Sequence, residues 1–170
     1  MWSFRTISFL VVLGLLGACG FRPLYSDRTA GGAPLELPII KVEPIPDRIG
    51  QQLHNHLLTA LNPRGLSQRP RYNLQTLVKE STSSLAVSKS AFATRANFIV
   101  DVNYRLTTPA GGKTLFSAKS SITVSYNILD SEFATLMAEK DARARAVREV
   151  SEDIRIRLGV FLARQQGQEK

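Results

Sequence analysis

Apolar and polar residues alternate most regularly between positions 92 and 106. Residues of one parity are mainly apolar, whereas those of the other parity are largely polar or charged. A period of two is typical of a β-strand that packs one face and leaves the other in contact with solvent. We therefore predict a long strand whose packed face carries Phe92, Thr94, Ala96, Phe98, Val100, Val102, Tyr104 and Leu106.

Strand-like segments flank this strand on both sides. In residues 71–87, Tyr72 and Val78 share one parity but the last apolar residues fall on the other, so we expect a β-bulge near Glu80–Ser84. A turn at 108–113 precedes a further alternating segment. Sequential strands joined by short turns predict an antiparallel meander. The third strand packs through Phe116, Ala118, Ile122, Val124 and Tyr126.

A short helix is predicted before this meander. Residues 37–45 have the composition of a brief strand ended by prolines, and Asp47 is placed to cap the helix that follows. Asn62-Pro63 ends it. Its apolar face recurs every four residues, at Ile49, Leu53, Leu57 and Leu61.

The last segment has the period of a long helix, which Asp130 or Ser131 is placed to cap. Three charge pairs at a spacing of four, each with the acid first, support it: Glu139–Arg143, Asp141–Arg145 and Asp153–Arg157. We expect its apolar stripe to pack on the sheet rather than on a membrane surface. The stripe contains Phe133, Leu136, Met137, Ala144, Val147, Val150, Ile154, Leu158 and Phe161.

The predicted order of elements is β-α-β-β-β-α. This order suits an α+β fold, a two-layer sandwich in which a small, mostly antiparallel sheet carries both helices on one face. We place this single domain at residues 37–164 and a flexible tail at 165–170. The other face of the sheet and its edges are then open to a partner.

The first 18 residues have the layout of a secretory signal peptide, with one basic residue, an uncharged apolar run and small residues at the end. The run is shorter than the ~20 residues of a spanning helix. It leads into Leu16-Gly17-Ala18-Cys19, which resembles a bacterial lipobox and contains the single cysteine of the chain. We predict a signal peptide at 1–18, lipidation at Cys19 and a lipidated tether at 19–36. An uncleaved membrane anchor is the alternative.

The net charge of the chain limits the classes of partner that we expect it to bind. Loss of Arg5 with the signal peptide lowers the formal net charge from +8 to +7. In an exported lipoprotein a basic surface is suited to anionic lipid head groups, a phosphorylated glycolipid or an acidic protein rather than to nucleic acid. A solvated surface with a basic bias is the alternative interpretation.

Residues suited to catalysis or metal binding do not form a recognisable motif. His54 and His56 stand two residues apart on the predicted short helix, so they point in different directions and cannot share a metal ion. Gly111-Gly112-Lys113 lacks the rest of a phosphate-binding loop, and no serine sits in a nucleophile elbow. We predict no enzymatic activity, no metal and no cofactor.

Three stretches resemble the LPS-assembly lipoprotein family LptE, in its alphaproteobacterial form: LGACGFRPLY at 16–25, AFATRANFIVDVNYRL at 91–106 and residues 125–158. The resemblance implies the two-layer fold predicted above and a non-catalytic role. Members plug a large β-barrel, LptD, help it to assemble and help lipopolysaccharide to reach the outer leaflet. A periplasmic binding or pilot lipoprotein of another envelope machine is the alternative.

Two further expectations follow from these motifs. Gly20 rather than aspartate follows the lipidated cysteine, so we predict the outer membrane, on its periplasmic side. Lys89 lies at the predicted turn between two long strands and Arg95 lies further along the polar face. We hypothesise that both contact the phosphates of lipopolysaccharide, because charge-assisted contacts to phosphate are strong. An ordinary solvated hairpin tip is the alternative.

Overall fold

The structure is a computed structural model that describes residues 40–63, 65, 69–87, 93–109 and 112–168. These residues all belong to the second of the two compact units of the chain, Leu35–Lys170. The predictions for residues 1–36, including Cys19, therefore lie outside the described residues, as does Lys89.

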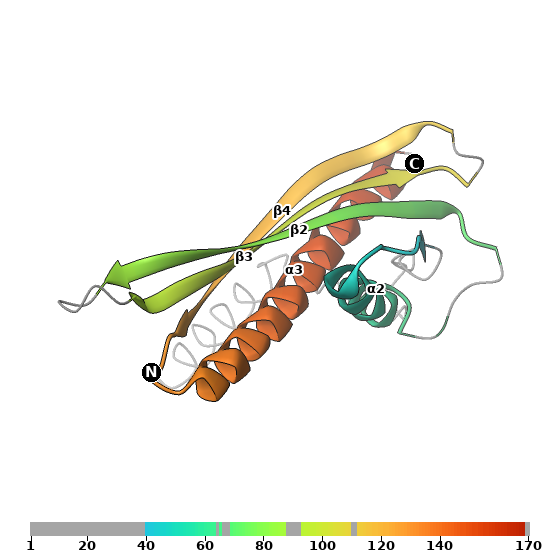
Figure 1. The fold of residues 1–170 in the computed structure, drawn as a ribbon. Helices are drawn as coiled ribbons and strands as arrows, with labels where there is room; N and C mark the ends of the chain where they lie inside the picture. Colours follow the sequence, from blue (N-terminus) through green and yellow to red (C-terminus); the bar gives the residue numbers. More distant parts are fainter. Residues whose placement is uncertain (1–39, 64, 66–68, 88–92, 110–111, 169–170) are drawn as a thin grey trace, which may run out of the picture. The chain divides into compact units, whose positions relative to one another are not determined.

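The elements follow the predicted order β-α-β-β-β-α, which confirms the α+β fold class (Figure 1). The sheet has the order β1-β2-β3-β4 and is mixed, because β1 runs parallel to β2 while the other pairs are antiparallel. The elements are β1 (Ile40–Val42), α2 (Arg48–Leu61), β2 (Tyr72–Val87), β3 (Ala93–Thr107), β4 (Thr114–Asn127) and α3 (Glu132–Gln168).

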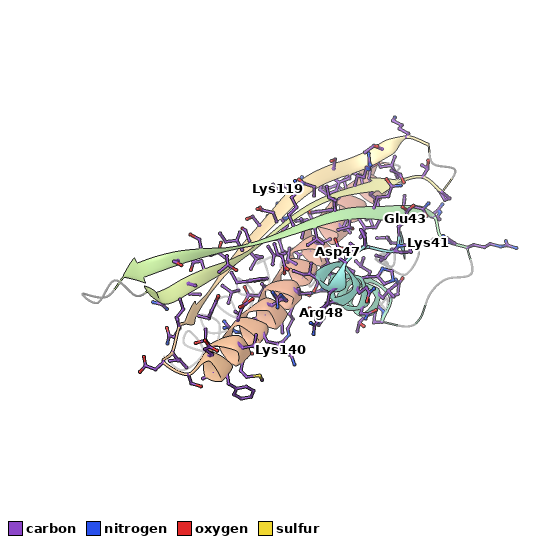
Figure 2. All side chains as sticks on the ribbon, in the orientation of Figure 1. Lys41, Glu43, Asp47, Arg48, Lys119 and Lys140 are labelled. Carbon is purple, nitrogen blue, oxygen red and sulfur yellow. The ribbon has the colours of Figure 1, made fainter. Side chains whose placement is uncertain are left out.

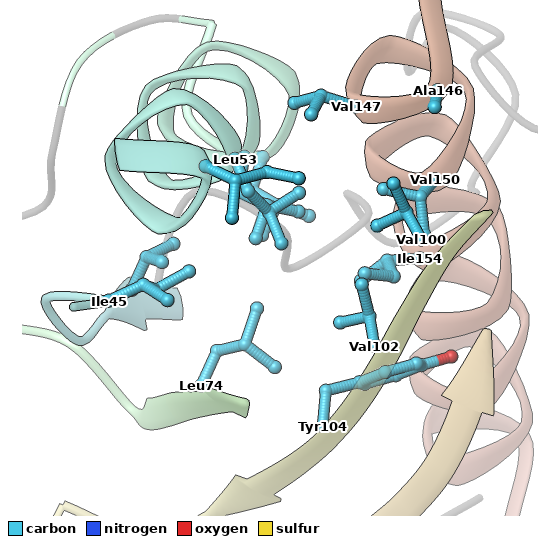
Figure 3. Close-up of a cluster of buried hydrophobic side chains, with 14 of the residues drawn as sticks. Ile45, Leu53, Leu74, Val100, Val102, Tyr104, Ala146, Val147, Val150 and Ile154 are labelled. Atoms are coloured by element: carbon cyan, nitrogen blue, oxygen red, sulfur yellow. The ribbon is translucent and has the colours of Figure 1, made fainter. Parts of the chain in front are cut away.

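The core lies between the sheet and the two helices. The even-numbered residues of β3 from Ala96 to Leu106 are buried, as the alternation predicts. They meet the predicted face of α2 and the middle and last turns of α3 (Figure 3). The helical side of this core consists of Ile49, Leu53, Leu57, Leu61, Ala142, Ala146, Val147, Val150, Ile154, Leu158 and Leu162.

The joint between β1 and α2 differs from the prediction in one detail. Asp47 is the residue before the helix, but its side chain makes no capping hydrogen bond and its φ is 67°. Its carbonyl oxygen instead accepts the first helical hydrogen bond from the amide of Gln51, at 2.9 Å. A Cβ at Gly50 would lie 2.7 Å from Cγ2 of Ile45, so this tight joint requires a glycine.

A bulge in β2 is present but lies further along than predicted. The register against β3 is regular from Asn73 to Ser84, and the shifts fall between Ser84 and Ala86 and between Ala86 and Val87. The expected position at Glu80–Ser84 is therefore wrong by a few residues. The regular register also keeps the polar face of β2 continuous over most of its length.

The first turns of α3 overturn part of the predicted stripe. Phe133, Leu136 and Met137 expose 73, 60 and 46% of their surface, and Ala144 is exposed as well. Alanines 142 and 146 are buried in their place. The reason is that α2 lies beside only part of α3 (Figure 1), and within the described part of the chain no other helix packs on the first turns of α3.

The charge pairs predicted along α3 all form. Glu139–Arg143, Asp141–Arg145 and Asp153–Arg157 join at 3.1, 2.8 and 2.9 Å. Ser131 caps the helix, because its Oγ accepts a hydrogen bond from the amide of Ala134. The helix extends to Gln168, so helical backbone reaches into the segment 165–170 that we expected to be a flexible tail.

Candidate functional site

The face of the sheet turned away from the helices is polar and basic. We call it the open face, and it consists of the odd-numbered strand residues whose even-numbered neighbours form the core. No described helix packs on it. Its strand positions carry one acid, Asp101, and five cationic residues: Lys41, Lys79, Arg95, Arg105 and Lys119.

The acid is neutralised in the middle of the face. Nζ of Lys119 lies 2.9 Å from Oδ1 of Asp101. The hydrogen bonds from Lys119 and from the hydroxyl of Ser121 lower the pKa of Asp101 below its usual value. Among the described residues, no ion pair holds the cations at the two ends of the face, Arg95 at one and Arg105 at the other.

Arg95 is placed where the sequence predicts it, on the polar face of β3. It is exposed and pairs in register with Ala86 on one side and Asn127 on the other. The structure leaves untested whether Lys89 lies beside it, because that residue is outside the described part of the chain.

An exposed apolar patch lies at the same end of the sheet as Arg95. We call it the α3 patch, and it consists of Leu129, Phe133, Leu136 and Met137. The hydroxyl of Thr135 holds Leu129 in place, since it accepts from the Leu129 amide at 2.9 Å and donates to the Leu129 carbonyl at 3.1 Å. Lys140 is exposed one turn further on (Figure 2). This end of the domain therefore offers both cations and apolar side chains, as an anionic amphiphile requires.

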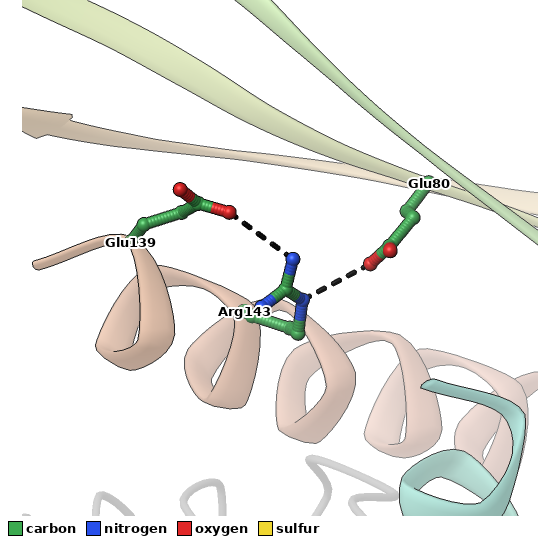
Figure 4. A network of polar contacts seen from close by, with 3 residues as sticks. All are labelled: Glu80, Glu139 and Arg143. Carbon is green, nitrogen blue, oxygen red and sulfur yellow. Dashed lines mark hydrogen bonds and ion pairs between the residues drawn. The ribbon is translucent and has the colours of Figure 1, made fainter. Parts of the chain in front are cut away.

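A single arginine ties this end of the hairpin to α3. Nε of Arg143 lies 3.0 Å from Oε2 of Glu80 on β2, and Nη2 lies 3.1 Å from Oε1 of Glu139 (Figure 4). The guanidinium carbon also sits 5.0 Å from the centre of the Phe98 ring. Arg143 thus joins helix and sheet where α2 does not reach.

A shallow groove with a volume of about 540 Å³ lies on the open face at the other end. We call it the Arg105 groove. Sequence reasoning missed it, although the polar parity of the predicted strands contains most of its side chains. It is lined by Glu43, Pro44, Gln75, Thr76, Leu77, Asn103, Tyr104, Arg105 and Ser117.

The described residues contain no group of three or more His, Cys, Asp or Glu side chains placed to hold a metal ion. Nδ1 of His54 lies 3.1 Å from the carbonyl oxygen of Glu43, and His56 is exposed on α2. Within the same residues, no helix combines the length and apolar character needed to span a membrane.

Comparison with known proteins gives a family match and similar folds. The family model described as "LptE: Lipopolysaccharide-assembly" matches residues 34–158. An uncharacterized protein of Rickettsia prowazekii (strain Madrid E) is 27% identical over 157 residues, which cover 92% of this chain and 97% of that protein.

Two solved structures share the fold. A Caulobacter crescentus CB15 protein described as a lipoprotein is 24% identical, with a TM-score of 0.62 over 76% of this chain and 96% of that one. Lipoprotein B of Nitrosomonas europaea is 16% identical, with a TM-score of 0.59 over 81% of this chain and 92% of that one.

Proposed function

Because the chain belongs to the LptE family of lipopolysaccharide-assembly proteins, we propose that it is a non-catalytic lipoprotein of the outer membrane. In this role it plugs the LptD β-barrel, assists the assembly of that barrel and helps to deliver lipopolysaccharide to the outer leaflet. The observation that carries the proposal is the family match across residues 34–158, which spans nearly the whole described domain.

A lipid anchor at Cys19 holds the protein to the periplasmic side of the outer membrane. The supporting observation is Leu16-Gly17-Ala18 before the single cysteine. Replacing Cys19 with serine is expected to block both acylation and cleavage of the signal peptide. Mass spectrometry of the membrane-extracted protein measures both, and a cleaved variant of unchanged lipid mass would contradict the anchor.

Lipopolysaccharide binds at the end of the domain that carries Arg95 and the α3 patch. The exposed guanidinium suits a lipid A phosphate, and the apolar patch suits acyl chains. Lys89, six residues before Arg95 in the sequence, is the second cation that we propose for this contact. The barrel partner surrounds the polar open face, which is compatible with the wet, polar interior of large outer-membrane barrels.

The double variant Lys89→Glu, Arg95→Glu tests this placement. Exposed charge changes leave the free energy of unfolding within about 0.5 kcal/mol, so the variant should fold. We expect weaker binding of lipopolysaccharide at low salt while association with LptD persists. Arg164→Glu, an exposed change near the far end of α3, is the control. Parent-like affinity in the folded double variant would refute the placement.

A further inference from the structure

We propose that the Arg105 groove is a second binding site, for the phosphorylated saccharide of a glycolipid. The identity of the glycolipid rests on the proposed function, whereas the evidence for a binding site comes from the residues of the groove. It lies at the opposite end of β3 from Arg95. Ten residues of strand separate Arg95 from Arg105, which is roughly 34 Å at 3.4 Å per residue. One sugar unit cannot contact both arginines.

The sheet register gathers the polar side chains of the groove into two rows. Gln75, Arg105 and Ser117 are partners across β2, β3 and β4, so their side chains stand side by side on the open face. Leu77, Asn103 and Lys119 form the adjacent row. Strands about 4.8 Å apart make each row roughly 10 Å wide.

Glu43 closes the groove on its β1 side. Its amide donates to the carbonyl of Leu74 at 3.0 Å, which continues the pairing of β1 with β2 by one residue and brings Glu43 beside Gln75. Figure 2 shows Glu43 and Lys41 close together at this end of the sheet. The carboxylate therefore faces the same groove as the amides and the guanidinium.

This set of groups suits a sugar. The amides of Gln75 and Asn103 both donate and accept hydrogen bonds, and the carboxylate of Glu43 accepts them. Sugar hydroxyls need both kinds of partner. Leu77 exposes 53% of its surface at the rim and offers an apolar contact for the C–H face of a ring. About 540 Å³ lies within the range of small-ligand sites.

Two cations, Arg105 in the groove and Lys41 beside Glu43 (Figure 2), outnumber the one carboxylate that lines the groove, so the charge favours an anionic sugar. Among the described residues neither Arg105 nor Lys41 takes part in an ion pair, whereas Asp101, the one acid among the strand positions of the open face, is already bound by Lys119. A phosphate beside Arg105 would complete a charge-assisted, bidentate contact. Arginine matches this planar geometry better than lysine does.

Calorimetric titration of the full lipidated protein in detergent tests the site. The probes are deacylated lipopolysaccharide with its phosphates, the same saccharide after phosphatase treatment, and inorganic phosphate. We expect Arg105→Glu to weaken binding of the phosphorylated saccharide about tenfold or more. We expect Arg148→Glu, the same change on an exposed position of α3, to leave it unchanged. Dephosphorylation should weaken binding to the parent protein, and inorganic phosphate should compete only poorly.

A second variant, Asn103→Ala, keeps the test valid if Arg105→Glu folds poorly, because it changes the sugar contact without changing charge. Equal affinity of the parent, Arg105→Glu and Asn103→Ala for the phosphorylated saccharide would show that the groove is not a binding site. A parent protein that binds no phosphorylated saccharide would show the same.

The failure of this inference can be told apart from the failure of the proposed function. If binding of intact lipopolysaccharide is lost in the double variant Lys89→Glu, Arg95→Glu but is unaffected by Arg105→Glu, the inference fails and the proposed function stands. If the saccharide binds through Arg105 while no LptD association is found, the groove stands and the proposed function fails.

Discussion

The two halves of α3 differ in what covers them. Val147, Ile154 and Leu158 are buried in the core that the sheet and both helices form, whereas Phe133 and Met137 in the first turns are exposed. Both halves carry apolar residues at helical spacing, but among the described elements only α2 lies beside α3, and it does so away from the first turns (Figure 1). An apolar stripe at helical spacing therefore indicates which side chains can be buried. Whether they are buried within this chain depends on which other elements pack against the helix.

The contacts that hold α3 to the rest of the domain also differ along the helix. The half beside α2 is held by buried apolar side chains, which give most of the stability of a fold. Nearer the start of α3, Arg143 adds a polar attachment to β2, because it bridges Glu80 and Glu139 over the ring of Phe98. Partly exposed polar contacts of this kind are weaker. We expect the first half to open more readily and to be the half that meets a partner.

The largest effect is expected in the covered half. Ile154→Ala removes a side chain that is fully buried, so the free energy of unfolding should fall by about 2–5 kcal/mol. Chemical denaturation of the parent and the variant measures this loss. A loss below about 0.5 kcal/mol would mean that Ile154 faces outward and that the two halves do not differ as described.

An intermediate effect is expected at the bridge. Arg143→Ala should cost about 1 kcal/mol, since it removes a partly exposed ion-pair network and a cation–π contact. The matched control is Arg145→Ala, whose pair with Asp141 stays within α3. Hydrogen exchange should become faster in β2 around Glu80 for the first variant alone. Equal exchange in both variants would show that the bridge does not hold the hairpin.

The smallest effect on stability is expected in the exposed half. Phe133→Ser should change the free energy of unfolding by less than about 0.5 kcal/mol, because the ring is already exposed. Phe161→Ser is the matched control, since Phe161 stacks on Phe116 with ring centres 4.8 Å apart and its loss should destabilise clearly. A comparable loss in both variants, measured by thermal unfolding, would place Phe133 in the core.

The fold was largely predictable because the alternation in β3 and the four-residue spacing in α2 each follow a single period. The open face was predictable for the same reason, since its residues are the polar parity of the strands. The exposed first turns of α3 were not predictable. Their apolar residues recur at the same helical period as the buried ones. That period does not indicate how far α2 packs along α3.

The candidate sites also differ in how far the sequence alone could predict them. Arg95 could be assigned to the polar face from parity alone, and the structure places it there. The Arg105 groove required the register between three strands, which brings Gln75, Arg105 and Ser117 together from distant parts of the sequence. The Arg143 bridge likewise needed the register, because Glu80 is 63 residues away along the chain.

Copurification tests the proposed association of this protein with LptD. Full-length tagged protein is extracted from membranes in mild detergent, and the proteins retained with it are identified by mass spectrometry. We expect a stable complex with one LptD barrel, reduced by Phe133→Ser and retained by Ile156→Ser, an exposed change elsewhere on α3. Recovery of a secretin or of no barrel at all would contradict the proposed association.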